Sequence, residues 1–172
     1  ITPCRACNGT GRVRTTRELQ IHIPPGVTTG TKLRVANEGK VGESGLCGDL
    51  YVVIQVRPHP VFSRDGKDIV CELPIPLETA LFGGIVDVPT ISGKTRMKIA
   101  PGTQGGTTLR IRGKGAPALK GGARGDQLVR VQVETPVNLT DEQKRALMNL
   151  SLSSANYPRQ AEFQRKAAQF LK

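Results

Sequence analysis

Two stretches that read almost alike decide the fold: IPPGVTTGTKLRVANEGK at residues 23–40 and IAPGTQGGTTLRIRGKGA at residues 99–116. At a constant offset of 76 residues, the identical positions of the first stretch are Ile23, Pro25, Gly26, Gly30, Thr31, Leu33, Arg34 and Gly39. A further match, between GDLYVVIQV at 48–56 and GDQLVRVQV at 125–133, follows at an offset of 77. Because two copies are too few for a solenoid, the repeat predicts two similar β-rich domains in tandem.

Both copies follow one plan: an apolar strand, a Pro-Gly turn, a short strand, a Gly-rich loop and a longer strand. Apolar residues alternate with polar ones at 19–23, and alternation continues at 50–56 and 129–133, which is typical of half-buried strands. The region between the copies predicts a strand at 69–75, a helix at 77–82, a strand at 85–88 and a hairpin within 88–99. The expected fold class is therefore mainly β, with two tandem β-sandwich-like domains, short helices and a C-terminal helical segment.

The second copy has a lead-in that the first copy lacks. The predicted strand–helix–strand at 69–88 precedes the second copy, whereas only 22 residues precede Ile23. If the two domains are alike, the first has lost its opening elements, so we expect a fragment that begins inside a cysteine-rich insertion. The expected parts are 1–11 (end of the cysteine-rich region), 12–62 (C-terminal half of the first β-domain), 63–136 (second β-domain) and 137–172 (C-terminal helices).

Cys4 and Cys7 have the C-x-x-C spacing by which one zinc ion takes two thiolates. A closed structural site needs four ligands, yet Cys47 and Cys71 are solitary, as are the two histidines. From the residues alone, the pair is either a redox dithiol or half of a zinc site whose other ligands lie elsewhere. The remaining cysteines do not suggest a disulfide framework, which favours a reducing compartment.

The composition narrows the function classes. The net charge is +11 over 172 residues, which invites a nucleic-acid interpretation, but aromatic residues make up only 3% of the chain. Stacking platforms for bases are therefore scarce. No apolar run approaches the roughly 18 residues of a membrane span. No arrangement of serine or cysteine with histidine suggests nucleophilic catalysis, so we expect a protein that is not an enzyme.

Several motifs taken together resemble one family. CRACNGTG at 4–11 resembles the C-x-x-C-x-G-x-G repeat of bacterial DnaJ, the J-domain co-chaperones of the heat-shock response. The two repeat stretches, GDLYVVIQVRPHPVFSRDG and ETALFGGIVDVPT resemble the two β-domains of that family's C-terminal substrate-binding half, in order, over residues 4 to about 136. The His-Pro-Asp signature of the J domain occurs nowhere in the chain.

The resemblance implies a cytoplasmic co-chaperone that takes part in protein folding under stress. Such a protein binds extended apolar segments of unfolded polypeptides and, when intact, delivers them to the ATP-driven chaperone DnaK. The resemblance also implies that Cys4 and Cys7 are zinc ligands in the intact protein, and we expect this half-site to be empty in the present chain. The alternative is a basic zinc-ribbon adaptor that binds nucleic acid.

By the same resemblance, Leu19 and Val52 line the substrate pocket of the first domain, with Ile21 and Ile54 as neighbours. The alternation of both segments is equally consistent with four residues that simply fill the core. No membrane partner is expected.

The C-terminal segment predicts two helices. Thr140 can cap the first, with Gln143 in capping-box position. The second, at about 159–171, carries one apolar face made of Phe163, Ala167, Phe170 and Leu171. The residues alone leave open whether this face packs on the second domain, on a membrane surface or on a partner chain. The resemblance implies the last, a homodimer.

Overall fold

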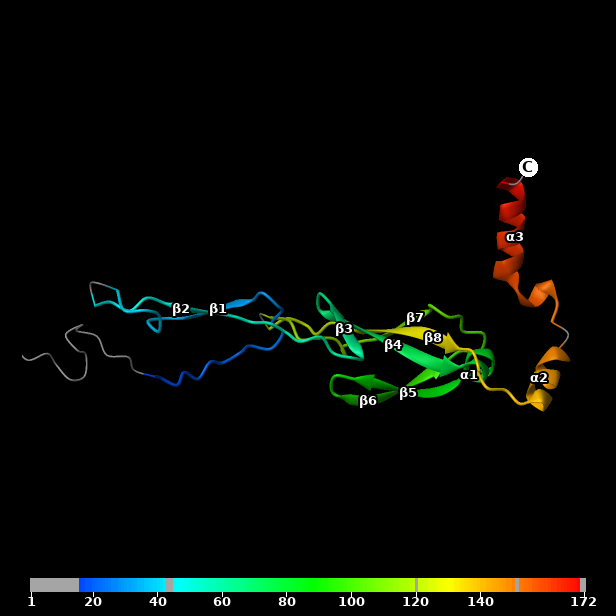
Figure 1. Cartoon of the computed structure of the whole chain (residues 1–172), viewed down its shortest axis with the longest axis horizontal. Coiled ribbons are helices and arrows are strands. Elements are labelled where there is room, and N and C mark those ends of the chain that lie inside the picture. Colours follow the sequence, from blue (N-terminus) through cyan, green and yellow to red (C-terminus); the bar gives the residue numbers. More distant parts are fainter. Residues whose placement is uncertain (1–15, 43–44, 120, 151, 171–172) are drawn as a thin grey trace, which may run out of the picture.

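The computed structural model describes residues 16–42, 45–119, 121–150 and 152–170. Figure 1 shows an elongated molecule with the first sequence copy at one end, the second in the middle and the C-terminal helices at the other end. The strands are β1 (Lys32–Val35), β2 (Leu50–Val53), β3 (Phe62–Asp65), β4 (Asp68–Pro76), β5 (Gly84–Thr90), β6 (Gly93–Ile99), β7 (Thr108–Ile111) and β8 (Gln127–Glu134). The helices are α1 (Leu77–Phe82), the 3-10 turn η1 (Ser154–Asn156), α2 (Asp141–Met148) and α3 (Pro158–Phe170). We call residues 16–58 the first module and residues 62–134 the second module.

The second module is built around a four-stranded sheet in the order β3-β4-β8-β7. The pairing of β4 with β8 is parallel, whereas β3 with β4 and β7 with β8 pair antiparallel. The β5–β6 hairpin forms a separate two-stranded sheet, and side chains from both sheets share the core. The predicted strands, hairpin and short helix of this region are confirmed.

The core of the second module consists of two adjoining clusters. One contains Ile75, Ala80, Ile99 and Val131, and the other contains Cys71, Val88 and Val129. Alternate residues of β4 and β8 point to this core, which is the period-two pattern that the sequence predicts for a strand with one buried face. Ala80 brings α1 onto the same core. The second module is therefore a complete β-sandwich with its own hydrophobic core.

The first module repeats half of this design in the same register. Leu33 lies opposite Val52 in the β1–β2 pair, and their counterparts Leu109 and Val129 lie opposite each other in the β7–β8 pair. The loop hydrogen bonds also repeat. The N–H of Asn37 donates to Asp49 Oδ1 at 3.1 Å, and the N–H of Gly113 donates to Asp126 Oδ1 at 2.9 Å. The tandem repeat predicted from the sequence is thus confirmed at the level of individual hydrogen bonds.

One predicted strand is absent. Residues 19–23 carry the alternating pattern of a strand, but the structure assigns them no strand pairing. Their counterparts at offset 76 are residues 95–99 of β6, whose strand partner is β5. The first module has no counterpart of β5 within the described residues, so the segment lacks a neighbour to complete a hydrogen-bonded ladder. The prediction was wrong because a strand depends on its partner as well as on its own pattern.

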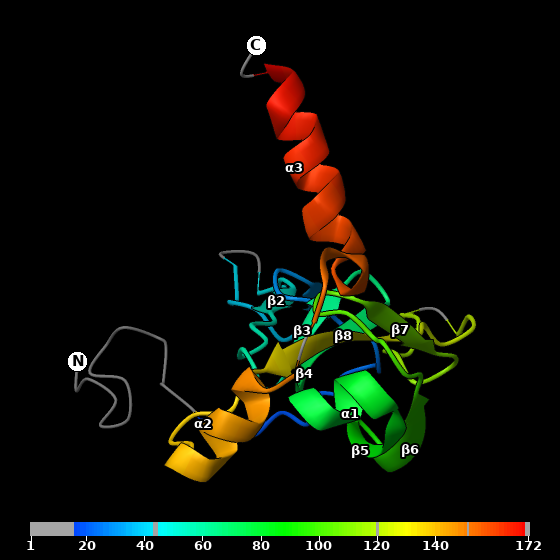
Figure 2. The ribbon, with the colours of Figure 1, turned by 90° about the vertical axis from the view of Figure 1, so that its right-hand side faces the viewer.

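The C-terminal helices project from the body of the second module, as Figures 1 and 2 show. Helix α2 begins with the predicted capping box. Thr140 Oγ1 accepts from the N–H of Gln143 at 3.2 Å, and the N–H of Thr140 donates to Gln143 Oε1 at 2.8 Å. No residue of α2 is buried. The capping box and the acidic residues of the first turn therefore stabilise this helix more than packing does.

Candidate functional site

Strand β2 of the first module has one open edge in the part of the chain that the structure describes. In the second module β8 lies between β4 and β7, whereas β2 pairs with β1 alone. Ile54 uses its N–H and C=O toward the β1 side, in bonds of 2.9 Å to Thr31 O and 2.8 Å from the N–H of Gly30. Because backbone groups of successive strand residues point to opposite sides, those of Val53 and Gln55 face the open edge.

The pairing of β4 with β8 in the second module indicates how long the open edge of the first module is. β4 pairs with β8 from Gln127 to Glu134, and the counterparts of these residues are Leu50 to Arg57. A strand that took the position of β4 beside β2 would therefore find backbone partners along residues 50–57. Unpaired edges of this kind readily accept another strand.

One face of the β1–β2 pair is also left incompletely covered. Val129 and Val131 are 0% and 1% exposed in the second module, whereas their counterparts Val52 and Ile54 are only half-buried. The contrast is larger for Ile99 and Ile23, whose exposed fractions are 0% and 53%. In the second module the core covers these positions with residues of β4, β5 and α1. The first module thus presents an apolar face where the second has a filled core.

The predicted pocket residues lie in this module. Val52 and Ile54 alternate along one face of the β2 region and are half-buried. Leu19 is 39% exposed, and Ile21 is half-buried in the same irregular segment. An ion pair of 3.7 Å between Arg17 and Glu38 holds the start of that segment beside the loop that follows β1. The structure therefore places Val52 on β2 and Ile54 just beyond its end, and it places Leu19 and Ile21 on a separate segment with no strand assignment.

Three further residues share this face, although the site prediction did not include them. Leu33, Val35 and Leu50 are half-buried and share the face of Val52, because residues opposite each other in the β1–β2 register point the same way. The repeat carries the signal that could have found them, since each aligns with a residue of β7 or β8.

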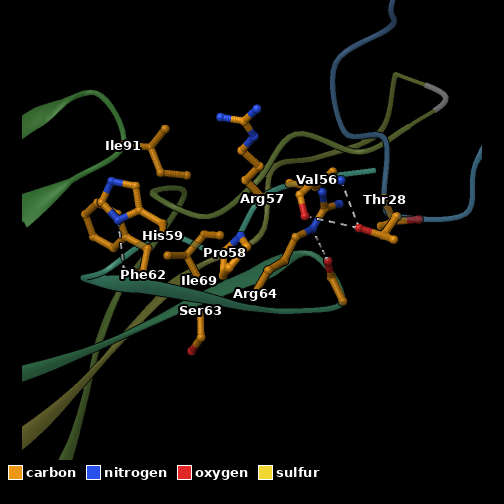
Figure 3. Close-up of a pocket in the computed structure, with 12 residues that line it drawn as sticks. Thr28, Val56, Arg57, Pro58, His59, Phe62, Ser63, Arg64, Ile69 and Ile91 are labelled. Atoms are coloured by element: carbon orange, nitrogen blue, oxygen red, sulfur yellow. Dashed lines mark hydrogen bonds between the residues drawn. The ribbon is translucent and has the colours of Figure 1, made fainter. Parts of the chain in front are cut away.

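A cavity of about 720 Å³ lies where the first module meets the second. Figure 3 shows Ile91 reaching in from the β5–β6 side, His59 and Phe62 lying together, and Arg64 extending toward Thr28 and Val56. Its apolar wall consists of Val56, Pro58, Phe62, Ile69 and Ile91. This junction too was missed, because its lining comes from segments that are far apart in the sequence.

The predicted zinc ligands Cys4 and Cys7 lie outside the described residues. Of the two cysteines that are described, Cys71 is 1% exposed and packs in the core with Val88 and Val129, and Cys47 is exposed on the first module. Across residues 16–170, leaving out the undescribed positions, no group of three or more potential ligands is gathered.

The predicted dimerisation face is visible in part. Phe163 is 71% exposed on α3, and Ala167 is half-buried. The side chain of Phe170 and the whole of Leu171 fall outside the described part of the chain. None of the described helices combines the length and the apolar character needed to cross a membrane.

Comparison with known proteins gives a consistent picture. The family model described as "DnaJ C terminal domain" matches residues 5–136. The chain is 48% identical over 171 residues to the Chaperone protein DnaJ of Opitutus terrae, covering 98% of this chain and 45% of that protein. It is 46% identical to the proteins of the same name from Rhodobacter capsulatus and Paracoccus denitrificans, covering 44% and 46% of their lengths. The chain thus spans less than half the length of these curated relatives.

Proposed function

The chain belongs to the family of DnaJ C-terminal domains, and on that premise we propose that it is the client-binding part of a molecular co-chaperone. It binds extended apolar segments of unfolded polypeptides at the first module. The observation that supports this most directly is the contrast between the modules: residues sealed in the second have counterparts in the first that remain half-buried beside an open strand edge.

The open edge suits an unfolded chain because such a chain has free backbone donors and acceptors. An added strand can pair with the N–H and C=O groups of Val53 and Gln55, which is the β-augmentation mode of peptide recognition. Its alternate side chains then meet the face of Val52 and Ile54, and we assign Leu19 and Ile21 to the same pocket. Burial of each apolar side chain contributes about 1.5–3 kcal/mol, so the affinity grows with the number of alternate apolar residues in the client.

The proposal extends to a full-length protein of the kind that the relatives above represent. There, the client is delivered to the chaperone DnaK through a J domain, Cys4 and Cys7 are zinc ligands, two chains form a dimer, and the protein acts in the cytoplasm. A thiolate pair suits zinc chemically, although two ligands are only half of a structural site. The alternative of a zinc-ribbon nucleic-acid adaptor receives no support from the matching family model or from the names of the relatives.

Adjacent residues on β2 provide a matched test. Val52 faces the uncovered apolar side, whereas Val53 is 59% exposed on the opposite face. We expect Val52→Asp and Ile54→Asp each to weaken binding of a labelled peptide with alternating leucines by about tenfold to a hundredfold, the equivalent of one lost apolar contact. Val53→Asp, which adds the same charge beside the same edge, should change the affinity less than about threefold.

Fluorescence anisotropy gives the dissociation constants, and suppression of aggregation of a chemically unfolded client gives an independent readout. Circular dichroism checks that all three variants keep the secondary structure. Equal losses in the three variants would point to a charge effect, and unchanged binding in Val52→Asp and Ile54→Asp would place the client site on another part of the molecule.

A further inference from the structure

The junction between the two modules has little that would fix their relative direction. Within the part of the chain that the structure describes, no strand of one module pairs with a strand of the other. Apolar side chains of both modules line a cavity of about 720 Å³ at the junction. Modules joined in this way are expected to move relative to each other unless some other contact holds them.

Arg64 provides such a contact. Its side chain rises from β3 and donates to Val27 O from Nη1 at 2.8 Å and to Gly26 O from Nη2 at 2.9 Å. Its Nε donates to Gly66 O at 2.7 Å, which holds the guanidinium against its own turn. Across the described ranges, the two bonds to residues 26 and 27 are the hydrogen bonds that cross between the modules. A planar guanidinium that makes two such bonds fixes an angle as well as a distance.

Gly26 shows how closely the second module approaches this turn. Its φ is +88°, and a Cβ built there would lie 2.5 Å from the carbonyl oxygen of Pro117. The repeat counterpart Gly102 has a similar φ of +76° with no atom within 4 Å of its Cβ position. Glycine is therefore needed at position 26 for two reasons: the backbone has a positive φ, and a side chain there would collide with the second module. At Gly102 only the positive φ calls for glycine.

Two hydrogen bonds to His59 fix the linker between the modules at the end where it enters β3. His59 Nδ1 accepts from the N–H of Val61 at 3.1 Å and from that of Phe62 at 3.3 Å, and this fixes the chain where it enters β3. Since Arg64 lies on the same strand, the direction of β3 and the position of the Gly26 turn are set together.

We propose that Arg64 is a positioning residue, which clamps the Pro25–Gly26 turn onto the second module and so sets the direction in which the first module is presented. This inference does not depend on the client-binding proposal, because it concerns the relative orientation of two modules whose folds stand on their own contacts.

A measurement of the distance between the two modules tests the proposed role of Arg64 directly. Spin labels on the exposed Cys47 of the first module and on Ser92→Cys of the β5–β6 turn report that distance, with Cys4 and Cys7 changed to serine and the buried Cys71 left unlabelled. We expect a single narrow distance distribution in the parent chain. Arg64→Ala should broaden it and shift its maximum, and Arg64→Lys, which keeps the charge but not the planar fork, should restore it only in part.

Arg130→Ala is the matched control, because Arg130 lies in the second module with an exposed 4.0 Å ion pair to Glu72 and no bond to the first module. The distribution should stay narrow in this variant. A distribution that stays equally narrow in Arg64→Ala would overturn the proposal.

The two turn glycines give a second test that holds even if removal of Arg64 perturbs folding. Gly26→Ala and Gly102→Ala suffer the same strain at positive φ, but only Gly26→Ala meets the second module. We expect the distance distribution to shift in Gly26→Ala and to remain unchanged in Gly102→Ala. Equal behaviour of the two variants would show that the turn does not bear on the orientation of the modules.

Discussion

At the scale of single residues, Asp49 and Asp126 show how one carboxylate shapes a loop in each module. Each accepts a backbone N–H from a residue at positive φ, Asn37 at 60° and Gly113 at 67°. Each also lies beside the arginine that the repeat retains, with an N–O distance of 2.7 Å for Arg34 and 3.7 Å for Arg110. The carboxylate closes the Gly-rich loop, and the arginine side chain is largely exposed.

The loop bond should therefore matter more than the ion pair. We expect Asp126→Ala to lower the free energy of unfolding by about 1–2 kcal/mol, because a charge-assisted bond to backbone is lost. Arg110→Ala should cost less than about 1 kcal/mol, as is usual for an exposed ion pair. Urea denaturation measures both, with Glu72→Ala as a surface control. Equal costs for Asp126→Ala and Arg110→Ala would show that the ion pair, and not the loop bond, stabilises the turn.

Two residues show why single-residue roles were only partly predictable. Gln127 is 0% exposed, and its Nε2 donates to Pro89 O at 2.7 Å, whereas its repeat counterpart is Leu50. Arg64 bonds to carbonyl groups 37 and 38 residues away. Periodicity identifies which side chains face the core, and the repeat identifies their counterparts. Neither reveals a polar contact whose partner is a backbone atom of a distant turn.

At the scale of elements, patterns with local causes were predicted well. Helix α1 follows from the segment that ends at Gly83, and α2 begins at the capping box of Thr140 and Gln143. The failed strand at 19–23 has the same apolar alternation as β6, but β6 has β5 beside it. Helices contain their own hydrogen-bond partners and strands do not, so an isolated strand pattern is the weaker prediction.

Helix α3 has an exposed aromatic side chain that could contact a second chain. Its Phe163 is 71% exposed, and no residue of the described chain covers it. If α3 mediates the proposed dimer, sedimentation velocity should show that Phe163→Asp shifts a dimeric parent to monomer. Ala161→Asp introduces the same charge on another side of the helix and should leave the dimer intact. A parent that is already monomeric, or a Phe163→Asp variant that stays dimeric, would exclude this face as the contact.

At the scale of the whole molecule, the two modules should differ in stability. The second has a closed core around Ile75, Ile99 and Val131. In the first, Ile54, the counterpart of Val131, is half-buried, and Ile23, the counterpart of Ile99, is 53% exposed. Local opening costs less where fewer apolar contacts are broken. We expect amides of β1 and β2 to exchange with solvent about tenfold faster or more than those of β4 and β8, a difference of at least about 1.4 kcal/mol in opening free energy.

Hydrogen exchange monitored by NMR checks this module by module. Uniform protection across β2 and β8 would mean that the molecule opens as one cooperative unit and that the uncovered face does not weaken the first module.

The length of the relatives leads to a further expectation about the whole molecule. This chain covers 45% of the Opitutus terrae protein, and the proposed client site lies beside an edge of β2 that has no strand partner among the described residues. We expect the chain to bind an unfolded client more weakly than that intact relative does, in a side-by-side peptide titration. Equal affinities would show that this chain contains the whole pocket.

The shared register of the two modules also says something about their history. The glycines that turn the backbone at 26 and 102 and at 30 and 106 are identical, and so is the arginine at 34 and 110. Among the positions that face the core, Leu33 and Leu109 are still identical, whereas Leu50 corresponds to Gln127. An ancestral gene segment that was duplicated and fused would leave this record, in which both descendants inherited the same turn glycines while single core positions diverged.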